Sequence, residues 1–196
     1  KDFPLTSMEI NKQVGAHLWS IYKKKVQLKN PDLTCYIEIV NGMAYVGVDR
    51  ISGYGGLPVG VSEKAVSLIS SGIDSPVASF ELVKRGVDIT YVHFHSVPST
   101  SRQSIRNVKS ILKVLAEYQL ECPLVVIPLL PIQQMIMENI PNKYWVILFR
   151  RAMVYLACKL AEEKKASVLI SGESVGQVAS QTLSNIRAVD DAADFP

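Results

Sequence analysis

The chain has 196 residues, of which 48% are hydrophobic and 20% are charged, and its net charge is +3. This composition supports a folded core and excludes a disordered chain, while the charge is too small to indicate nucleic-acid binding by itself. No apolar stretch reaches the ~18 residues of a transmembrane helix, and the N-terminus has no signal-peptide pattern, so we expect no membrane association.

The three cysteines are Cys35, Cys122 and Cys158, an odd number without the spacing of a metal site. Disulfides are rare in a reducing compartment, so a cytoplasmic location fits this cysteine usage best. We expect each of the three thiols to be an inert group in the core.

Residues 1–60 differ in pattern from the rest of the chain. Thr6-x-x-Glu9 is a capping box, which predicts that a helix begins here. The apolar side chains of this helix recur at helical spacing and fall on one face. They are Ile10, Val14, Leu18 and Ile21.

Two strands are predicted after this helix, at 33–40 and 44–48, because Asn41-Gly42 between them is a strong hairpin signal. Residues 1–60 therefore indicate a small α+β unit with too little core to be complete. The last residues of this part, 53–60, have the glycine content of a flexible linker.

Four lysines cluster in this first part, at Lys23, Lys24, Lys25 and Lys29. A solvated helix end is the ordinary explanation, since cations at a helix C-terminus also interact favourably with the helix dipole. Contact with an RNA backbone is the second explanation. Charge alone does not decide between them.

From about residue 61, predicted strands alternate with predicted helices. Such alternation indicates an α/β fold with a parallel sheet that is covered on both faces. Thr100-x-x-Gln103 is a second capping box and predicts the start of the second helix. The strands are expected at 65–69, 87–94, 124–127 and 167–170, and the other helices at 76–85, 132–139 and 144–164.

The turn after the first of these strands is the most informative segment. Ser70-Ser71-Gly72 follows the buried strand, and Asp74-Ser75-Pro76 begins a helix. A small-residue turn that leads into a helix N-terminus collects backbone N–H groups, so it is a site for an anion. The plain alternative is a Ser/Gly turn in which Asp74 is only the N-cap.

Three strand ends carry small or polar residues, at 70–72, 93–96 and 171–174. In an open parallel sheet, ligands bind beyond the carboxyl ends of the strands, where the strand order reverses. We therefore expect these three segments to line one crevice.

The segment 68–78 resembles the PP-loop motif S-G-G-x-D-S of ATP pyrophosphatases, with Ser71 in place of the first glycine. Three further runs resemble the tRNA 4-uridine sulfurtransferases, also called 4-thiouridine synthases. By the same resemblance, residues 1–60 are similar to the later part of a THUMP RNA-binding domain. The three runs are G-x-G-G-L-P-V-G at 53–60, H-F-H-S at 93–96 and G-E-S-x-G-Q-V-A-S-Q-T at 172–182.

This resemblance implies a PP-loop domain of the adenine nucleotide alpha hydrolase type at 61–196, truncated at its C-terminus, and a partial THUMP domain with its linker at 1–60. The implied reaction uses ATP and Mg²⁺ to adenylate a uracil carbonyl in tRNA, and a persulfide sulfur then displaces AMP to give 4-thiouridine. The implied partners are tRNA and a cysteine desulfurase. A homodimer and a sulfur-carrier role in thiamine biosynthesis stay open.

The resemblance also implies roles for individual residues. Asp74 is implied as catalytic, and the four clustered lysines as RNA-binding. His93 at a strand end also has a plain structural explanation, and of the arginine pair on the long helix we expect Arg151 to be solvated. The implied ATP-binding residues are Leu68, Ile69, Ser70, Gly72, Ser75, His93, Phe94, Arg150, Gly172 and Gln181.

Two other functions remain open at this point. Another PP-loop adenylating enzyme is disfavoured by the runs at 53–60 and 172–182. A non-catalytic RNA-binding protein is supported by Ser71, because serine resists the left-handed backbone that glycine allows. The resemblance further predicts a ferredoxin-like domain before this chain and a redox-active cysteine after it.

Overall fold

The computed structural model describes residues 3–27, 29–176, 182–193 and 195. The chain divides into two compact units, Lys1–Gly53 and Tyr54–Pro196, and each is described by itself. The sequence placed the division later, between residues 60 and 61.

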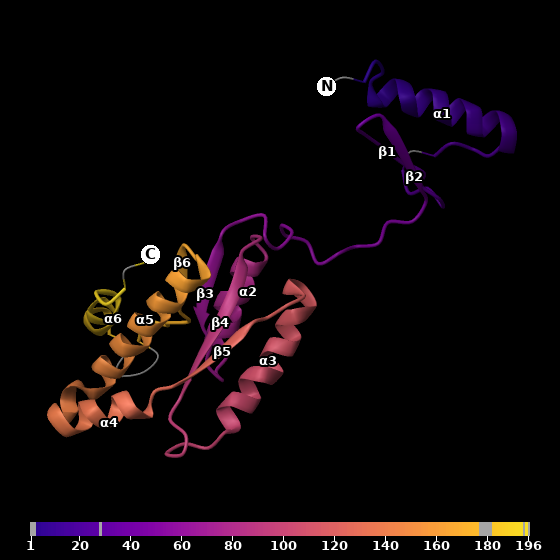
Figure 1. Ribbon diagram of the computed structural model, residues 1–196. Helices are drawn as coiled ribbons and strands as arrows, with labels where there is room; N and C mark the ends of the chain where they lie inside the picture. The colour runs from indigo at the N-terminus through magenta and orange to yellow at the C-terminus, as the bar shows by residue number, and fades with distance from the viewer. Residues whose placement is uncertain (1–2, 28, 177–181, 194, 196) are drawn as a thin grey trace. The chain divides into compact units, whose positions relative to one another are not determined.

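The first unit consists of one helix and one hairpin (Figure 1). Helix α1 (Ser7–Tyr22) begins at the predicted capping box, because Thr6 Oγ1 accepts from the N–H of Glu9 at 3.3 Å and the Glu9 carboxylate accepts from the N–H of Thr6 at 2.7 Å. Strands β1 (Tyr36–Val40) and β2 (Met43–Gly47) pair antiparallel around Asn41-Gly42. Both turn residues have positive φ, which confirms the predicted hairpin.

The described part of the first unit buries little. No residue of α1 is buried, and every residue of β2 is exposed. Ile10 and Val14 are half-buried, whereas Leu18 and Ile21 are exposed. The helix has the predicted apolar face, but the hairpin is too small to cover it.

The second unit is built on a four-stranded parallel sheet with the strand order β5-β4-β3-β6 (Figure 1). All four strands lie within one or two residues of the predicted positions, which confirms the α/β fold. Their bounds are β3 Lys64–Leu68, β4 Asp88–His95, β5 Leu124–Pro128 and β6 Val168–Ile170.

Helices cover both faces of this sheet, as predicted. Val108 and Leu112 of α3 pack with Tyr91 on one face, and Ala157 of α5 packs with Val92 on the other. None of the helices that the structure describes combines the length and apolar composition needed to cross a membrane. The helices are α2 (Asp74–Val83), α3 (Gln103–Gln119), α4 (Leu130–Asn139), α5 (Trp145–Lys164), preceded by the 3₁₀ turn η1 (Asn142–Tyr144), and α6 (Leu183–Asp190).

The second predicted capping box is wrong. Helix α3 begins at Gln103, and the residue before it makes no side-chain cap. The N–H of Thr100 instead closes a turn on the carbonyl of Ser96 at 3.0 Å. Ser101 takes the local acceptor role, since its hydroxyl accepts from the N–H of Gln103 at 3.2 Å.

The predicted flexible linker is largely a docked segment, residues 54–62, which we call the strap. The N–H of Leu57 donates to the carbonyl of Lys84 at 2.9 Å, and the N–H groups of Gly60 and Ser62 donate to the carbonyl of Gly86 at 2.9 and 3.1 Å. These bonds satisfy carbonyls at the C-terminal end of α2, which a helix leaves unpaired. Composition alone missed this docking, because glycine content does not show which backbone groups need partners.

Candidate functional site

The strand order places the reversal of the sheet between β3 and β6. The chain runs from β3 to β4 and then to β5, whereas β6 returns to the other side of β3. The loops that leave β3 and β6 therefore diverge at their carboxyl ends, which is where open parallel sheets bind ligands. The segments 70–72 and 171–174 follow the adjacent strands β3 and β6 at this edge, and 93–96 covers the last residues of the neighbouring strand β4 and the residue after it. That all three segments line one crevice stays a prediction.

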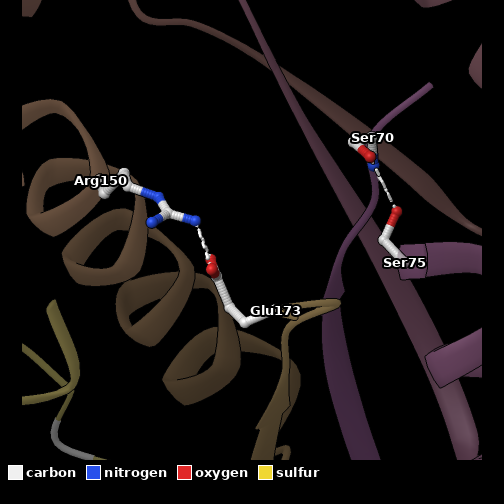
Figure 2. A network of polar contacts seen from close by, with 4 residues as sticks. All are labelled: Ser70, Ser75, Arg150 and Glu173. Carbon is white, nitrogen blue, oxygen red and sulfur yellow. Dashed lines mark hydrogen bonds and ion pairs between the residues drawn. The ribbon is translucent and has the colours of Figure 1, made fainter. Parts of the chain in front are cut away.

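Two serines join the start of the loop after β3 to the first turn of α2 (Figure 2). The N–H of Ser70 donates to the hydroxyl of Ser75 at 2.8 Å, and the two hydroxyl oxygens lie 3.0 Å apart. The N–H of Gly72 donates to the Ser70 hydroxyl at 3.2 Å. These bonds fix the loop in one shape before any ligand binds, which is a form of preorganisation.

A second pair of serines supports this loop from inside the protein. The Ser79 hydroxyl donates to the carbonyl of Ser75 at 2.8 Å, and it lies 2.8 Å from the hydroxyl of Ser67. Since the one proton of Ser79 is already donated, Ser67 is the donor of the second bond. Ser67 and Ser79 are fully buried. Sequence reasoning missed both, although Ser67 interrupts an apolar strand and Ser79 lies four residues after Ser75.

Backbone donors remain open at the start of α2. Within the described residues, the N–H groups of Ser71, Ile73 and Asp74 donate to no protein acceptor. Helix α2 begins at Asp74 with no side-chain cap, so the N-cap explanation for Asp74 is wrong. The half-buried Asp74 carboxylate likewise has no hydrogen bond in the described part of the chain. Open N–H groups at a helix N-terminus favour an anion.

Neither Ser71 nor Gly72 has a backbone conformation that requires glycine. Ser71 is not among the residues with positive φ, so serine causes no backbone strain at this position. Gly72 also lies outside the left-handed region, and a Cβ there would meet only the Ser70 hydroxyl at 3.4 Å, an ordinary contact. The protein itself therefore leaves open space in front of Gly72.

Gly172 is constrained by the protein itself. A Cβ at this position would lie 2.4 Å from the Ser75 nitrogen and 2.5 Å from the Ser75 Cα. The loop after β6 therefore lies against the first turn of α2. Glycine at position 172 therefore allows this close packing, a structural role that the family resemblance did not indicate.

An ion pair lies at the same edge of the sheet. Arg150 of α5 donates through Nη2 to both carboxylate oxygens of Glu173, which follows Gly172 (Figure 2). Their side chains are 22% and 28% exposed. Both residues line one small pocket with Leu68 and Ser171. The predicted solvation of Arg151 is wrong, because its guanidinium donates to the carbonyl of Ala188 in α6.

His93 is held by the protein. Its Nδ1 lies 2.9 Å from the carbonyl oxygen of Ile69, so Nδ1 carries the proton and donates. Its Nε2 lies 3.4 Å from the hydroxyl of Ser104, and the side chain is 6% exposed. Ile69 is buried as well, and Phe94 is half-buried against the core on the α5 face. The His93 side chain thus links β4 to the backbone of the residue that follows β3.

Of the remaining predicted site residues, Gln181 lies outside the described residues. The four lysines of the first unit are exposed. Lys23 caps α1 in the left-handed conformation, and its ammonium lies 4.6 Å from the ring centroid of Trp19. Trp19 itself is 55% exposed.

Metal-ligating groups are sparse in the part of the chain that the structure describes. It contains no group of three or more His, Cys, Asp or Glu side chains that could hold an ion. The cysteine prediction is wrong for Cys35, which is exposed, and is confirmed for Cys158, which is buried. Cys122 is half-buried, and this burial raises the pKa of its thiol.

Comparison with known proteins identifies the family. The model of the family described as "Thiamine biosynthesis protein (ThiI)" matches residues 60–196, and the THUMP domain model matches residues 1–49. The chain belongs to the ThiI family. This confirms the resemblance to sulfurtransferases with a THUMP domain.

Two curated relatives are each 42% identical over the whole chain. Both are described as "Probable tRNA sulfurtransferase", one from Moorella thermoacetica and one from Alkaliphilus oremlandii. This ThiI-family chain spans half the length of each relative.

Two solved structures match the whole chain. One is a 4-thiouridine synthetase in complex with RNA and bound ATP, with 40% identity and a TM-score of 0.77, of which the chain covers 52%. The other is PH1313 from Pyrococcus horikoshii, with 28% identity and a TM-score of 0.68, of which the chain covers 55%.

Proposed function

We propose that this chain is the nucleotide-binding part of an ATP-dependent tRNA sulfurtransferase that makes 4-thiouridine. The observation that carries the proposal is the group of open N–H donors at Ser71, Ile73 and Asp74. They lie at the reversal point of the sheet, in a chain that is 40% identical to a synthetase crystallised with ATP and RNA.

Each residue of the loop would have a separate task. The three N–H groups would bind phosphate oxygens, and the Ser70–Ser75 pair would hold these donors in place. Mg²⁺ keeps several waters and binds through one or two carboxylates together with substrate phosphates, so Asp74 alone fits such an ion. When bound, ATP supplies the adenylyl group that turns the uridine carbonyl oxygen into a leaving group for sulfur.

The base and ribose contacts are also proposals. Leu68 and Arg150 are supported because they line the same pocket. Ile69, His93 and Gly172 would act mainly by shaping the edge of the sheet, since their neighbours are protein atoms. Phe94 and Gln181 rest on the family pattern.

The wider role follows the family. We propose tRNA as the substrate, a cysteine desulfurase as the persulfide donor and the cytoplasm as the location. A homodimer and a function in thiamine biosynthesis belong to the same proposal. A reducing compartment suits the odd number of cysteines.

The nucleotide site is tested by calorimetry with ATP and Mg²⁺, followed by pyrophosphate release with tRNA in the full-length protein. Asp74→Ala should abolish release and leave the fold intact, because the Asp74 side chain forms no hydrogen bond in the described residues. The matched control is Glu81→Ala on the same helix, where the carboxylate only approaches Lys84 at the surface. Absence of ATP binding at millimolar concentration would contradict the proposal.

A non-catalytic RNA-binding protein is the second candidate, and Ser71 is the observation that favoured it. The backbone at Ser71 needs no glycine, so we expect Ser71→Gly to change pyrophosphate release little. A large gain in release would instead show that the native loop is degenerate.

The RNA site is tested through its salt dependence. Replacing Lys23, Lys24 and Lys25 with Ala should weaken tRNA binding and lower the slope of affinity against salt, because fewer phosphates are neutralised. ATP binding should not change. The matched control replaces the exposed Lys109, Lys113 and Lys165 of the second unit. If the two triple variants weakened tRNA binding equally, the RNA site would not be at Lys23–Lys25.

A further inference from the structure

The Arg150–Glu173 pair holds opposite charges together in the pocket. Arg150 is the cation that the family pattern directs at the nucleotide, yet its guanidinium donates to both oxygens of a carboxylate. Both side chains are about three-quarters buried, so water screens the pair less than it screens an exposed pair.

The position of Glu173 is fixed by its neighbour. Gly172 packs against the Ser75 backbone without room for a Cβ, so the loop after β6 cannot move away from α2 without losing this contact. Glu173 follows directly, and it lines the pocket together with Leu68 and Arg150. The carboxylate therefore lies at the same edge of the sheet as Ser70 and Ser75 (Figure 2), which flank the open N–H groups of the loop.

We propose that Glu173 is a positioning residue that holds and neutralises Arg150 until a phosphate oxygen of the substrate replaces its carboxylate. This inference rests on the proposed function. A guanidinium fork binds carboxylate and phosphate with the same geometry, so the exchange needs no rearrangement of Arg150. The carboxylate also opposes the entry of an anion that brings no positive partner, such as free pyrophosphate.

The first test is the affinity of the full chain for inorganic pyrophosphate, without Mg²⁺, and for adenosine. Glu173→Gln keeps the shape of the side chain and removes its charge. We expect pyrophosphate to bind about threefold tighter or more, the size of effect that a partly exposed ion pair supports. Adenosine affinity should stay unchanged. Glu163→Gln is the matched control, because it removes a carboxylate from the exposed pair with Lys164.

A double-mutant cycle then assigns the effect to Arg150. Arg150→Gln should weaken pyrophosphate binding, and Glu173→Gln should give a smaller gain in that background, because it then removes only the direct repulsion between the carboxylate and the anion. If Glu173→Gln bound pyrophosphate no more tightly than the wild type, the inference would be overturned. The proposed function would still stand if the wild type bound ATP. A wild-type chain that binds neither ATP nor pyrophosphate would overturn both.

Discussion

Gly172→Ala is expected to destabilise the second unit through a single methyl group. The added Cβ would lie 2.4 Å from the Ser75 nitrogen, 2.5 Å from its Cα and 2.8 Å from the carbonyl carbon of Asp74. All three neighbours are backbone atoms in the first turn of α2, so no side-chain rotation relieves the overlap.

The magnitude follows from this geometry. Ordinary contacts begin at 3.4 Å, so the loop after β6 and the start of α2 must separate by about 1 Å. Overpacking in a well-packed region costs about 1–3 kcal/mol, and rigid neighbours favour the upper end. A cost of about 3 kcal/mol raises the unfolding equilibrium constant roughly a hundredfold, and most domains survive such a loss.

Urea unfolding followed by tryptophan fluorescence measures this effect. Each unit contains one of the two tryptophans, Trp19 in the first and Trp145 in the second. A Trp19→Phe background leaves the half-buried Trp145 as the reporter of the second unit. The variant should unfold at a clearly lower urea concentration than its background.

Gly72→Ala is the matched comparison. Its Cβ meets only a hydroxyl at 3.4 Å, so stability should change little, while the methyl group would stand between Ser71 and Ile73, whose N–H groups we propose to bind phosphate. ATP affinity should therefore fall in Gly72→Ala with the urea midpoint retained. A Gly172→Ala variant as stable as its background would refute the packing argument. Unchanged ATP affinity in Gly72→Ala would refute the proposal that phosphate lies close to the backbone of this loop.

Three further predictions concern stability and exposure. Gly56→Ala should destabilise the second unit by about 1–3 kcal/mol in urea unfolding, because Gly56 has φ +86° and a Cβ would lie 2.5 Å from the Lys84 carbonyl oxygen; Gly53→Ala, with nothing within 4 Å, should be neutral. Burial raises the pKa of the Tyr91 hydroxyl and of the Cys122 thiol, so both keep protons in the folded state that the unfolded chain releases. The contribution of Cys122 to stability is therefore complete below about pH 9 and that of Tyr91 below about pH 10, and each is lost as the pH rises further. The urea midpoint should fall between about pH 8 and pH 11, and less steeply in Tyr91→Phe. Iodoacetamide should label the exposed Cys35 in the folded chain and the buried Cys158 only after unfolding, as peptide mass mapping would show.

The sequence by itself determined the elements and the family. Periodicity located every strand of the four-stranded sheet to within one or two residues, and Asn41-Gly42 located the turn of the separate hairpin, because both signals act locally. The serine and glycine turn before Asp74 indicated an anion site for the same reason, since a helix N-terminus and its loop are continuous in the chain.

Only the tertiary structure decided which residues have partners. In each of three contacts the two partners lie on different segments of the chain. These contacts are the Ser67–Ser79 bond that supports the loop, the bond from His93 to the carbonyl of Ile69, and the Arg150–Glu173 ion pair. Docking of the strap and the close packing of Gly172 likewise depend on contacts across the fold. Residue type states what a group can bind, but the three-dimensional arrangement decides which partner lies within reach.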